Sequence, residues 1–477
     1  MSANYLHGPE VIEIERGSRP VKGVKSAVIA VVGTAPAGPV NIPTLCLTEK
    51  DAAQFGEEAE GFTLPQALRA IYDFGAGTVV VVNVFDPKRH KVTQSEQDVT
   101  FDKATNQLQL KFPVVSKVTL KSQDAKITYA EGKDFTVEVA TGIVTRVANG
   151  AIAVGAQVRA TYDNADASKV TAADIIGNID AAGRRTGLKA LDETYTLFGF
   201  DVKILIAPVY CTQNSVTVEL IACAEKYKAL AYVDAPVGTT FAQAINGRGP
   251  AGNINFNTSS DRVRLCYPHA LVYDKATNKN RLEPLSQRAA GLRAKVDNDK
   301  GFWWSSSNQE IAGIVGMERA LSAKPGDPQS EVNLLNENGI TTVFNSFGSG
   351  LRLWGNRTAA FPSVTHMKNF ENVRRTADML NESLRFYSQQ YIDQPIDQAL
   401  IDALTESVNA YGRKLIGDGA LLGFLCWYDK NRNPNEELEA GHLLLSYKFT
   451  PKPPMERLTL ESEITGEFLA NLKGATN

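Results

Sequence analysis

The sequence predicts a multidomain α/β protein with a parallel or mixed sheet flanked by helices, an inserted all-β domain, and an extended strand arm at each end. Three observations lead to this fold class. Some segments are apolar on both faces, helical spacing separates them, and one long stretch alternates with a period of two. With 477 residues, the chain has room for about three domains.

The first arm is expected over residues 1–25, because glycine and proline recur often enough there to interrupt any helix. Within it, Ile12 and Ile14 alternate with Glu13 and Glu15, which is the pattern of a half-buried strand. We therefore expect a short strand carried on a tether.

A β-α-β unit follows this arm. Residues 27–33 are apolar on both faces, residues 63–74 have helical spacing, and residues 78–85 are again apolar on both faces. This order predicts a parallel sheet covered by helices. The same order returns later in the chain, with strands at 203–207, 229–233 and 262–267 and a helix at 215–227.

The stretch between these two α/β regions has a different character. From about residue 88 to 165, short alternating segments are separated by turn sequences, of which Asn149-Gly150 is the strongest hairpin signal. Helical spacing does not interrupt them. We expect an all-β domain at 88–170, inserted into the α/β chain.

The last third of the chain predicts two helices and two strands. Residues 367–390 and 396–415 each carry one apolar stripe, as expected for helices that pack against a core. A strand follows, with one apolar face made by Leu443, Leu445, Tyr447 and Phe449. After a proline-rich segment, a second short strand at 457–461 alternates Leu458 and Leu460 with polar residues.

These elements divide the chain into six units. Residues 26–87 and 171–350 form the α/β core, with the all-β insert between them, and residues 351–442 form a further domain. The two ends, 1–25 and 443–477, are expected to be linking arms.

Composition excludes several classes of function. Lys and Arg number 50 against 53 Asp and Glu, and this balance gives no support to a general nucleic-acid binder. Apolar runs stay well short of the roughly 18 residues that cross a bilayer, and the first residues lack the apolar region of a signal peptide. The five cysteines are dispersed, which favours buried free thiols in a reducing cytosol.

Motifs of catalysis, cofactor binding and metal binding are not convincing in this chain. Residues 247–252 read G-x-G-x-x-G, but they follow an expected helix rather than a strand, which favours a surface loop over a nucleotide site. The five histidines are scattered and never at metal-ligand spacing. We therefore predict no catalytic, cofactor or metal residues, although a triad assembled in space from distant residues is compatible with any sequence.

Several motifs occur together along the chain. They are Gly8-Pro9-Glu10-Val11 to Arg19-Pro20 running into Thr34-Ala35-Pro36, Tyr232-Val233-Asp234-Ala235-Pro236, Tyr267-Pro268, Ile340-Thr341-Thr342-Val343, and the stretch from Gly348 to Trp354-Gly355-Asn356-Arg357-Thr358. Over nearly the whole chain, these residues resemble contractile phage tail sheath proteins. The Trp-Gly-x-Arg-Thr stretch is the most specific of them.

The resemblance implies a structural subunit rather than an enzyme. It implies hexameric rings, stacked helically around a tail tube, that contract to drive the tube through a bacterial envelope for genome ejection. Because a convincing nucleotide site is missing from the sequence, we expect contraction without nucleotide hydrolysis. The domain at 171–350 would be similar to subtilisin in fold without its catalytic residues.

The implied partners are other copies of the chain, the tail tube protein, and baseplate and tail terminator proteins, with no nucleic acid and no membrane insertion. The implied location is the virion tail, assembled in the cytoplasm of the host bacterium.

The arms would then add strands to the sheets of neighbouring subunits. Their expected contact residues are Val11, Ile12, Ile14, Leu443, Leu445, Tyr447, Phe449, Leu458 and Leu460. The basic end of the 396–415 helix, Arg413 and Lys414, is a candidate contact with an acidic tube. The alternative is that these two cations only complement the helix dipole.

Three other functions stay open at this point. A tailocin or another contractile injection system would use the same kind of subunit. An α/β enzyme with an unrecognised active site would need hydrogen-bonded Ser, His and Asp side chains in a cleft. A surface-binding protein would use the 88–170 insert to recognise a host ligand.

Overall fold

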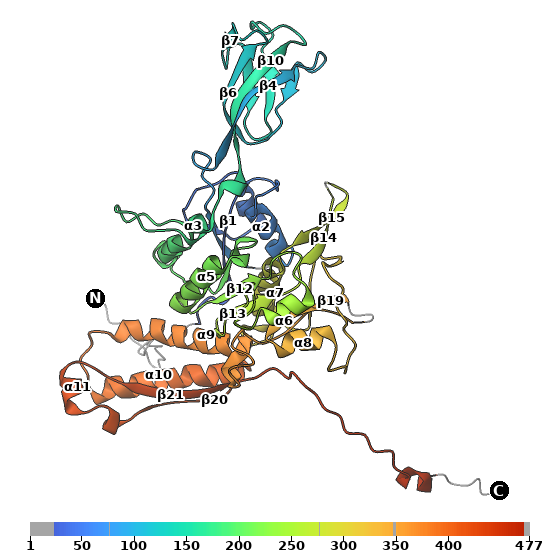
Figure 1. Ribbon diagram of the computed structural model, residues 1–477. Coiled ribbons are helices and arrows are strands. Elements are labelled where there is room, and N and C mark those ends of the chain that lie inside the picture. The colour runs from blue at the N-terminus through green and yellow to red at the C-terminus, as the bar shows by residue number, and fades with distance from the viewer. Residues whose placement is uncertain (1–22, 76, 276, 347–349, 472–477) are drawn as a thin grey trace, which may run out of the picture.

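The computed structural model describes residues 23–75, 77–275, 277–346 and 350–471 (Figure 1). The expected strand with Val11, Ile12 and Ile14 lies outside the described residues. The body of the protein is a nine-stranded sheet with strand order β16-β19-β18-β13-β12-β11-β1-β3-β2. Its strands are β1 (Val28–Gly33), β2 (Thr44–Cys46), β3 (Thr78–Asn83), β11 (Ile204–Ile206), β12 (Leu230–Asp234), β13 (Val263–Cys266), β16 (Gln309–Glu310), β18 (Ile340–Ser346) and β19 (Gly350–Trp354).

The centre of this sheet is parallel, as the β-α-β order predicts. β1 pairs in parallel with β3 and with β11, and the pairing stays parallel through β12 and β13 to β18. Among the described strands of this sheet, the antiparallel pairs lie toward the edges, at β2, β19 and β16. The predicted helices beside it are present as α2 (Leu64–Tyr72) and α5 (Asn214–Tyr227).

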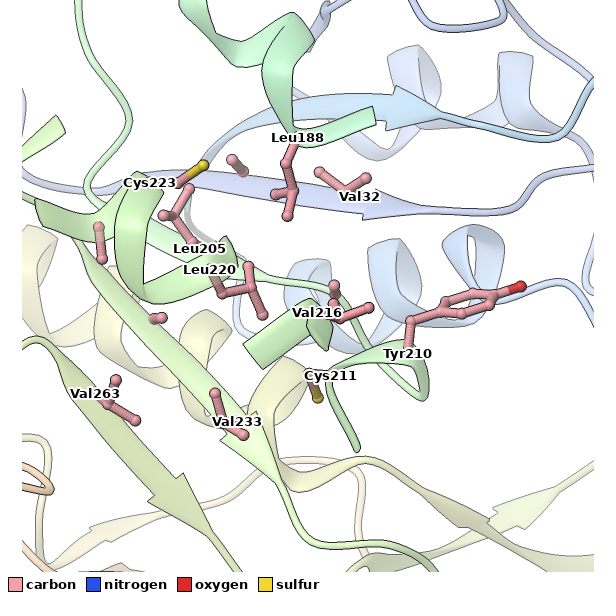
Figure 2. Close-up of a cluster of buried hydrophobic side chains, with 14 of the residues drawn as sticks. Val32, Leu188, Leu205, Tyr210, Cys211, Val216, Leu220, Cys223, Val233 and Val263 are labelled. Carbon is pink, nitrogen blue, oxygen red and sulfur yellow. The ribbon is translucent and has the colours of Figure 1, made fainter. Parts of the chain in front are cut away.

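Alternate side chains of β1 enter two separate apolar layers. Ile29 and Val31 pack beneath α2 and α7 (Leu285–Lys300), whereas Val32 packs toward α5. Figure 2 shows the α5 layer, where Leu220 lies beside Leu205, in one buried cluster with Val32 and Val233 of the strands. Each such side chain contributes about 1.5–3 kcal/mol when it is fully buried. The sheet is therefore covered on both faces, which explains why its strands lack polar alternation.

Residues 91–165 form two sheets of their own. One has strand order β4-β10-β6-β7 and the other β5-β9-β8, and they enclose a core that includes Phe101, Leu120, Phe135 and Tyr162. This unit projects from the body on β4 and β10 (Figure 1). The strands are β4 (Lys91–Thr100), β5 (Gln107–Gln109), β6 (Val115–Ser122), β7 (Thr128–Tyr129), β8 (Phe135–Glu138), β9 (Ile143–Arg146) and β10 (Gln157–Ala165).

The two long helices of the last third are present as α9 (Glu371–Ser388) and α10 (Gln398–Gly417). Asp397 caps α10, because its carboxylate accepts a hydrogen bond from the backbone N–H of Leu400 at 2.7 Å. Apolar side chains of both helices, among them Leu384 and Val408, pack together and against a hairpin of β20 (Leu421–Tyr428) and β21 (Leu445–Pro451). The hairpin and the two helices lie at the opposite end of the body from the 91–165 unit (Figure 1).

α7 is a long helix that the sequence pattern does not predict. It is buried on nearly all sides and contains arginines in the protein interior. Arg288 pairs with Glu283 at 2.9 Å and with Asp73 at 2.5 Å, and Arg293 pairs with Asp297. A helix covered all round shows no amphipathic stripe, so its periodicity is hidden.

Short elements complete the described fold. They are α1 (Glu49–Ala52), α3 (Ala172–Ile176), α4 (Thr194–Phe198), α6 (Phe241–Asn246), α8 (Glu331–Glu337), α11 (Asn435–Glu439), β14 (Ala270–Asp274), β15 (Lys279–Glu283) and β17 (Gly316–Met317). None of the helices in the described part of the chain has both the length and the apolar content needed to cross a membrane.

Candidate assembly surfaces

The β20–β21 hairpin changes the expected limits of the C-terminal arm. The sequence predicts an arm from residue 443, but β21 pairs antiparallel with β20 of its own chain, from Leu445 opposite Tyr428 to Pro451 opposite Leu421. The reason is that residues 421–428 form a second apolar strand close in sequence. Leu443, Leu445, Tyr447 and Phe449 therefore belong to this hairpin unit, and the arm begins after Pro451.

One face of the hairpin is packed against the helices. Phe424 lies opposite Phe449 and Cys426 opposite Tyr447, so these side chains share one face. The rings of Phe424, Tyr447 and Phe449 stack in a row, and the Tyr447 hydroxyl donates a hydrogen bond to Asn381 of α9 at 2.8 Å. The predicted single apolar face of 443–449 is thus directed toward the protein's own helices.

The outer face of the hairpin is largely open. Its β20 edge is partly covered by α10, because the Asn409 side chain donates to the Cys426 carbonyl and accepts from the Cys426 backbone N–H, each at 2.8 Å. On the outer face, the side chains of Leu422 and Leu425 are 62% and 46% exposed. β20 and β21 make a sheet of two strands, so within the described residues no third strand covers either edge. An uncovered edge presents unpaired N–H and C=O groups, which favour pairing with another strand.

The arm that follows β21 carries apolar side chains into solvent. It extends away from the body in Figure 1. Residues 452–465 form no strand or helix, although the sequence predicts a strand at 457–461, because a strand needs a partner for its hydrogen bonds. Leu458 and Leu460 are 64% and 82% exposed. Other exposed apolar side chains on the arm are Met455, Ile464, Phe468 and Leu469.

The root of this arm is held by Arg357. Its Nε donates to the Glu456 carboxylate at 2.9 Å, and its Nη2 donates to the other oxygen of the same carboxylate. Arg357 is the arginine of the Trp-Gly-x-Arg-Thr stretch, so the most specific motif of the sequence lies beside the arm.

The candidate tube contact lies at the C-terminal end of α10. Arg413 and Lys414 are both exposed there. Arg413, however, forms an ion pair with Glu406 at 2.5 Å on the same helix. The exposed surface at this end is therefore of mixed charge, and Lys414 supplies more of its net positive charge than Arg413 does.

α9 joins the C-terminal helices to the sheet through buried charges. Lys203 contacts Glu382 at 2.5 Å, and Arg262 contacts Asp378 through two hydrogen bonds of 2.8 and 3.0 Å. Toward the N-terminal end of α9, Arg375 pairs with Asp297. At that end, the Glu371 carboxylate accepts hydrogen bonds from Arg264 and from the Tyr232 hydroxyl, each at 2.5 Å. The opposite, apolar face of α9 packs on α10. α9 therefore connects the nine-stranded sheet to the unit formed by α10 and the hairpin.

An active site in a parallel α/β sheet would be expected at the carboxyl ends of the strands. Asp234 ends β12 there, and it accepts hydrogen bonds from the Ser286 backbone N–H at 2.8 Å and from the Cys211 thiol at 3.6 Å. Asp234 and Cys211 are 1% and 0% exposed, and burial raises the pKa of both groups. The nearby His269 is directed toward Glu318 instead, at 3.5 Å. A substrate could not reach this carboxylate, so this end of the sheet does not support the enzyme hypothesis.

The G-x-G-x-x-G loop is structural in its geometry. It follows α6, as expected, and Arg248 within it donates hydrogen bonds to five backbone carbonyls, which are those of Phe256, Thr258, Asn338, Ala359 and Phe361. Burial without a carboxylate partner lowers the pKa of Arg248 to about 10. A Cβ on Gly252 would lie 2.5 Å from the Cα of Gly247, so the glycines permit a tight turn rather than a phosphate cradle.

Among the residues that the structure describes, the remaining chemistry-bearing side chains do not gather into a further site. All five cysteines are buried free thiols, as the sequence predicts. Across the described stretches, His, Cys, Asp and Glu do not gather in groups of three that could hold a metal ion. A two-stranded hairpin without a third described strand and an exposed apolar arm are instead features of a protein that assembles with others through its strands.

Comparison with known proteins defines that class further. Residues 183–359 match the phage tail sheath protein central domain, and residues 363–465 match the phage tail sheath C-terminal domain. The chain belongs to the phage tail sheath protein family. It is 65% identical to the tail sheath protein of Burkholderia phage BcepMu, over 99% of this chain and the whole of that one. It is 27% identical to the tail sheath protein of Escherichia phage P2, over the whole of this chain and 99% of that one.

Solved structures share the fold. The sheath complex of an extracellular contractile injection system, PVC, in its contracted state matches with a TM-score of 0.60 at 14% identity, over 98% of this chain and 99% of that one. The contracted helical sheath of the anti-feeding prophage matches with a TM-score of 0.59 at 16% identity, over 97% of this chain and 99% of that one. The mixed α/β architecture is therefore that of sheath proteins.

Proposed function

We propose that this chain is the sheath subunit of a contractile phage tail and that its copies polymerise as hexameric rings stacked helically around a tail tube. The observation that carries the proposal is a two-stranded hairpin that no third described strand joins, beside an arm with exposed apolar side chains. The arm strand of one copy, with Leu458 and Leu460, would pair with the hairpin of a neighbour. The N-terminal arm, with Val11, Ile12 and Ile14, would occupy the second edge.

The energetics favour an array over a pair. Each new backbone hydrogen bond contributes about 0.5–1.5 kcal/mol, and ordering each arm residue costs about 1–2 kcal/mol. Burying Leu458 and Leu460 adds about 1.5–3 kcal/mol each. One arm on one hairpin is thus close to balance. When every copy gives and receives two arms, later contacts form at high effective concentration and the lattice becomes stable.

Contraction would proceed without nucleotide hydrolysis. In this proposal the extended sheath is metastable, and it releases free energy as subunits rotate into a better-packed state while the arms keep neighbours linked. Purified extended sheaths should therefore contract equally well with and without ATP when a chemical trigger is applied. A strict requirement for ATP would contradict this part of the proposal.

The proposed setting is the virion tail, assembled in the host cytoplasm, with tube, baseplate and terminator proteins as partners and the tube driven through the envelope for genome ejection. A phage is favoured over a tailocin because the 65% identical relative belongs to a phage. We also propose that residues 171–350 form the subtilisin-like domain, without catalytic residues, that residues 26–87 complete its α/β core, and that the 88–170 unit is outermost.

Electron microscopy of the purified protein tests the central proposal. Full-length protein should form long hollow tubes, whereas variants lacking residues 1–20 or residues 457–477 should not. Compact monodisperse particles from all three proteins would contradict strand exchange between subunits. Tubes from both truncations would show that assembly uses another surface.

A further inference from the structure

Arg357 is fixed in position by groups of the body. Its guanidinium carbon lies 4.4 Å from the centroid of the Phe361 ring and 3.7 Å from that of Phe370. Its Nη1 donates to the side-chain oxygen of Asn369, which is itself fully buried. The two rings and the amide thus define the plane of the guanidinium without help from the arm.

Glu456 completes this arrangement from the other side. Both of its carboxylate oxygens accept hydrogen bonds from Arg357, one from Nε and one from Nη2. The Arg357 side chain is 15% exposed and that of Glu456 is 42% exposed, so the pair is partly shielded from water. Two parallel bonds between a planar donor and a carboxylate specify direction as well as distance. A preset guanidinium therefore orients the arm residue that binds it.

The position of this pair divides the arm into a held part and a free part. Before it, the Asn372 side chain donates to the backbone carbonyl of Lys452 at 3.1 Å, and two prolines stiffen residues 453–454. After it, residues 457–465 form no strand or helix, and the side chain of Ile464 is fully exposed. The pair thus lies at the boundary, one residue before Arg457 and two before Leu458.

We propose that Arg357 is a positioning residue for strand exchange: it holds Glu456 and thereby sets the direction in which residues 457–471 leave the body. This inference rests on the proposed function, because only an arm that joins a neighbour needs a set direction. It assigns a role to the arginine of the Trp-Gly-x-Arg-Thr stretch. The partner of the positioned segment is the hairpin of a second copy of this chain.

A substitution on the arm side tests the role without disturbing the body. Glu456→Gln keeps the size of the side chain and removes its charge. The matched control is Glu463→Gln, which makes the same change further along the same exposed arm. Arg357→Lys is a second variant, since it keeps a cation between the rings and loses the paired donors. Lysine also loses the hydrogen bond to the buried Asn369 side chain, so thermal unfolding of Arg357→Lys should occur below that of the wild type. Glu456→Gln leaves the body intact and should unfold like the wild type, which separates the positioning role from a structural one.

Two readouts are compared. In unassembled subunits, trypsin cleavage after Arg457, with the product identified by mass, reports release of the arm root. Glu456→Gln and Arg357→Lys should be cleaved roughly three- to tenfold faster than wild type, because cleavage follows the population of the released form. Glu463→Gln should be cleaved at the wild-type rate. In assembly, tubes of Glu456→Gln should need a several-fold higher protein concentration than those of Glu463→Gln.

The two proposals fail in different ways. If Glu456→Gln and wild type are cleaved at the same rate, Arg357 does not hold the arm and this inference is wrong, whatever the tubes show. If cleavage differs but both arm variants assemble at the wild-type concentration, the pair does not position the arm for exchange, and the inference is also wrong. If the wild-type protein forms no tubes, the proposed function fails, and the cleavage rates alone decide whether Arg357 holds Glu456.

Discussion

Gly412 of α10 allows the hairpin to pack closely against this helix, because its lack of a Cβ leaves room for the Phe424 ring. A Cβ added there would lie 2.1 Å from Cδ1 and 2.8 Å from Cβ of Phe424. Alanine in place of glycine normally stabilises a helix by about 1 kcal/mol. Overpacking costs about 1–3 kcal/mol, and the upper part of that range applies because the Phe424 Cβ is fixed to the strand. We expect Gly412→Ala to destabilise the docked hairpin by about 1–2 kcal/mol, the difference between these terms.

Amide hydrogen exchange over residues 421–428 measures this change locally, which matters because a chain of several domains does not unfold in one step. Protection should fall about 5- to 30-fold. Gly417→Ala, at the end of the same helix, is the control, since a Cβ there meets nothing within 4 Å. Its protection should stay level or rise slightly. Equal protection in the two variants would refute the reasoning and show that the hairpin moves to accommodate the added Cβ without losing stability.

Three other predictions concern the insert and the helix end. Hydrogen bonds from Lys91 and Thr93 hold the pKa of Asp163 below its usual range, so the carboxylate stabilises the base of β4 and β10 above about pH 4 and loses this effect as the pH falls further. Exchange protection of these strands should therefore drop in acid, and Asp163→Asn should remove that dependence; an unchanged pH profile would contradict it. Lys91 and Ala165 lie opposite each other at the base of β4 and β10. Replacing residues 92–164 by a short Gly-Ser link should therefore leave a folded body that still forms tubes. Aggregation of this variant would show that the body does not fold independently of the insert. Reversing the charge of Arg413 and Lys414 together should weaken tube attachment in co-sedimentation, and unchanged attachment would remove these residues as tube contacts.

Periodicity predicts the parts of this fold in which one pattern dominates. The two-sided apolar strands β1 and β3 and the amphipathic helices α9 and α10 lie within a few residues of their expected bounds. α7 escapes prediction, because buried arginines such as Arg288 look like a solvated face until their carboxylate partners are known. The apolar run of residues 421–428 is a signal that could have revealed β20, and with it the pairing of β21.

The candidate surfaces could be predicted only in part. Exposed Leu458 and Leu460 follow from strand alternation next to prolines. The contact between Arg357 and Glu456 joins residues 99 positions apart, and no local pattern connects them. The pairing of Arg413 with Glu406 spans two helical turns, so the basic end of the helix looked more positive in sequence than it is in the structure.

The charged face of α9 fixes more than the attachment of one helix. From its N-terminal end onward, Glu371 contacts Arg264 and Arg375 contacts Asp297. Asp378 then contacts Arg262, and Glu382 contacts Lys203. A slip of one turn, about 5.4 Å, would place Glu371 near Asp297 and Arg375 near another arginine, where like charges repel strongly in a low dielectric. These charges therefore specify one axial position of α9 against the sheet. A force that reaches the C-terminal helices would pass into the sheet through these four buried ion pairs.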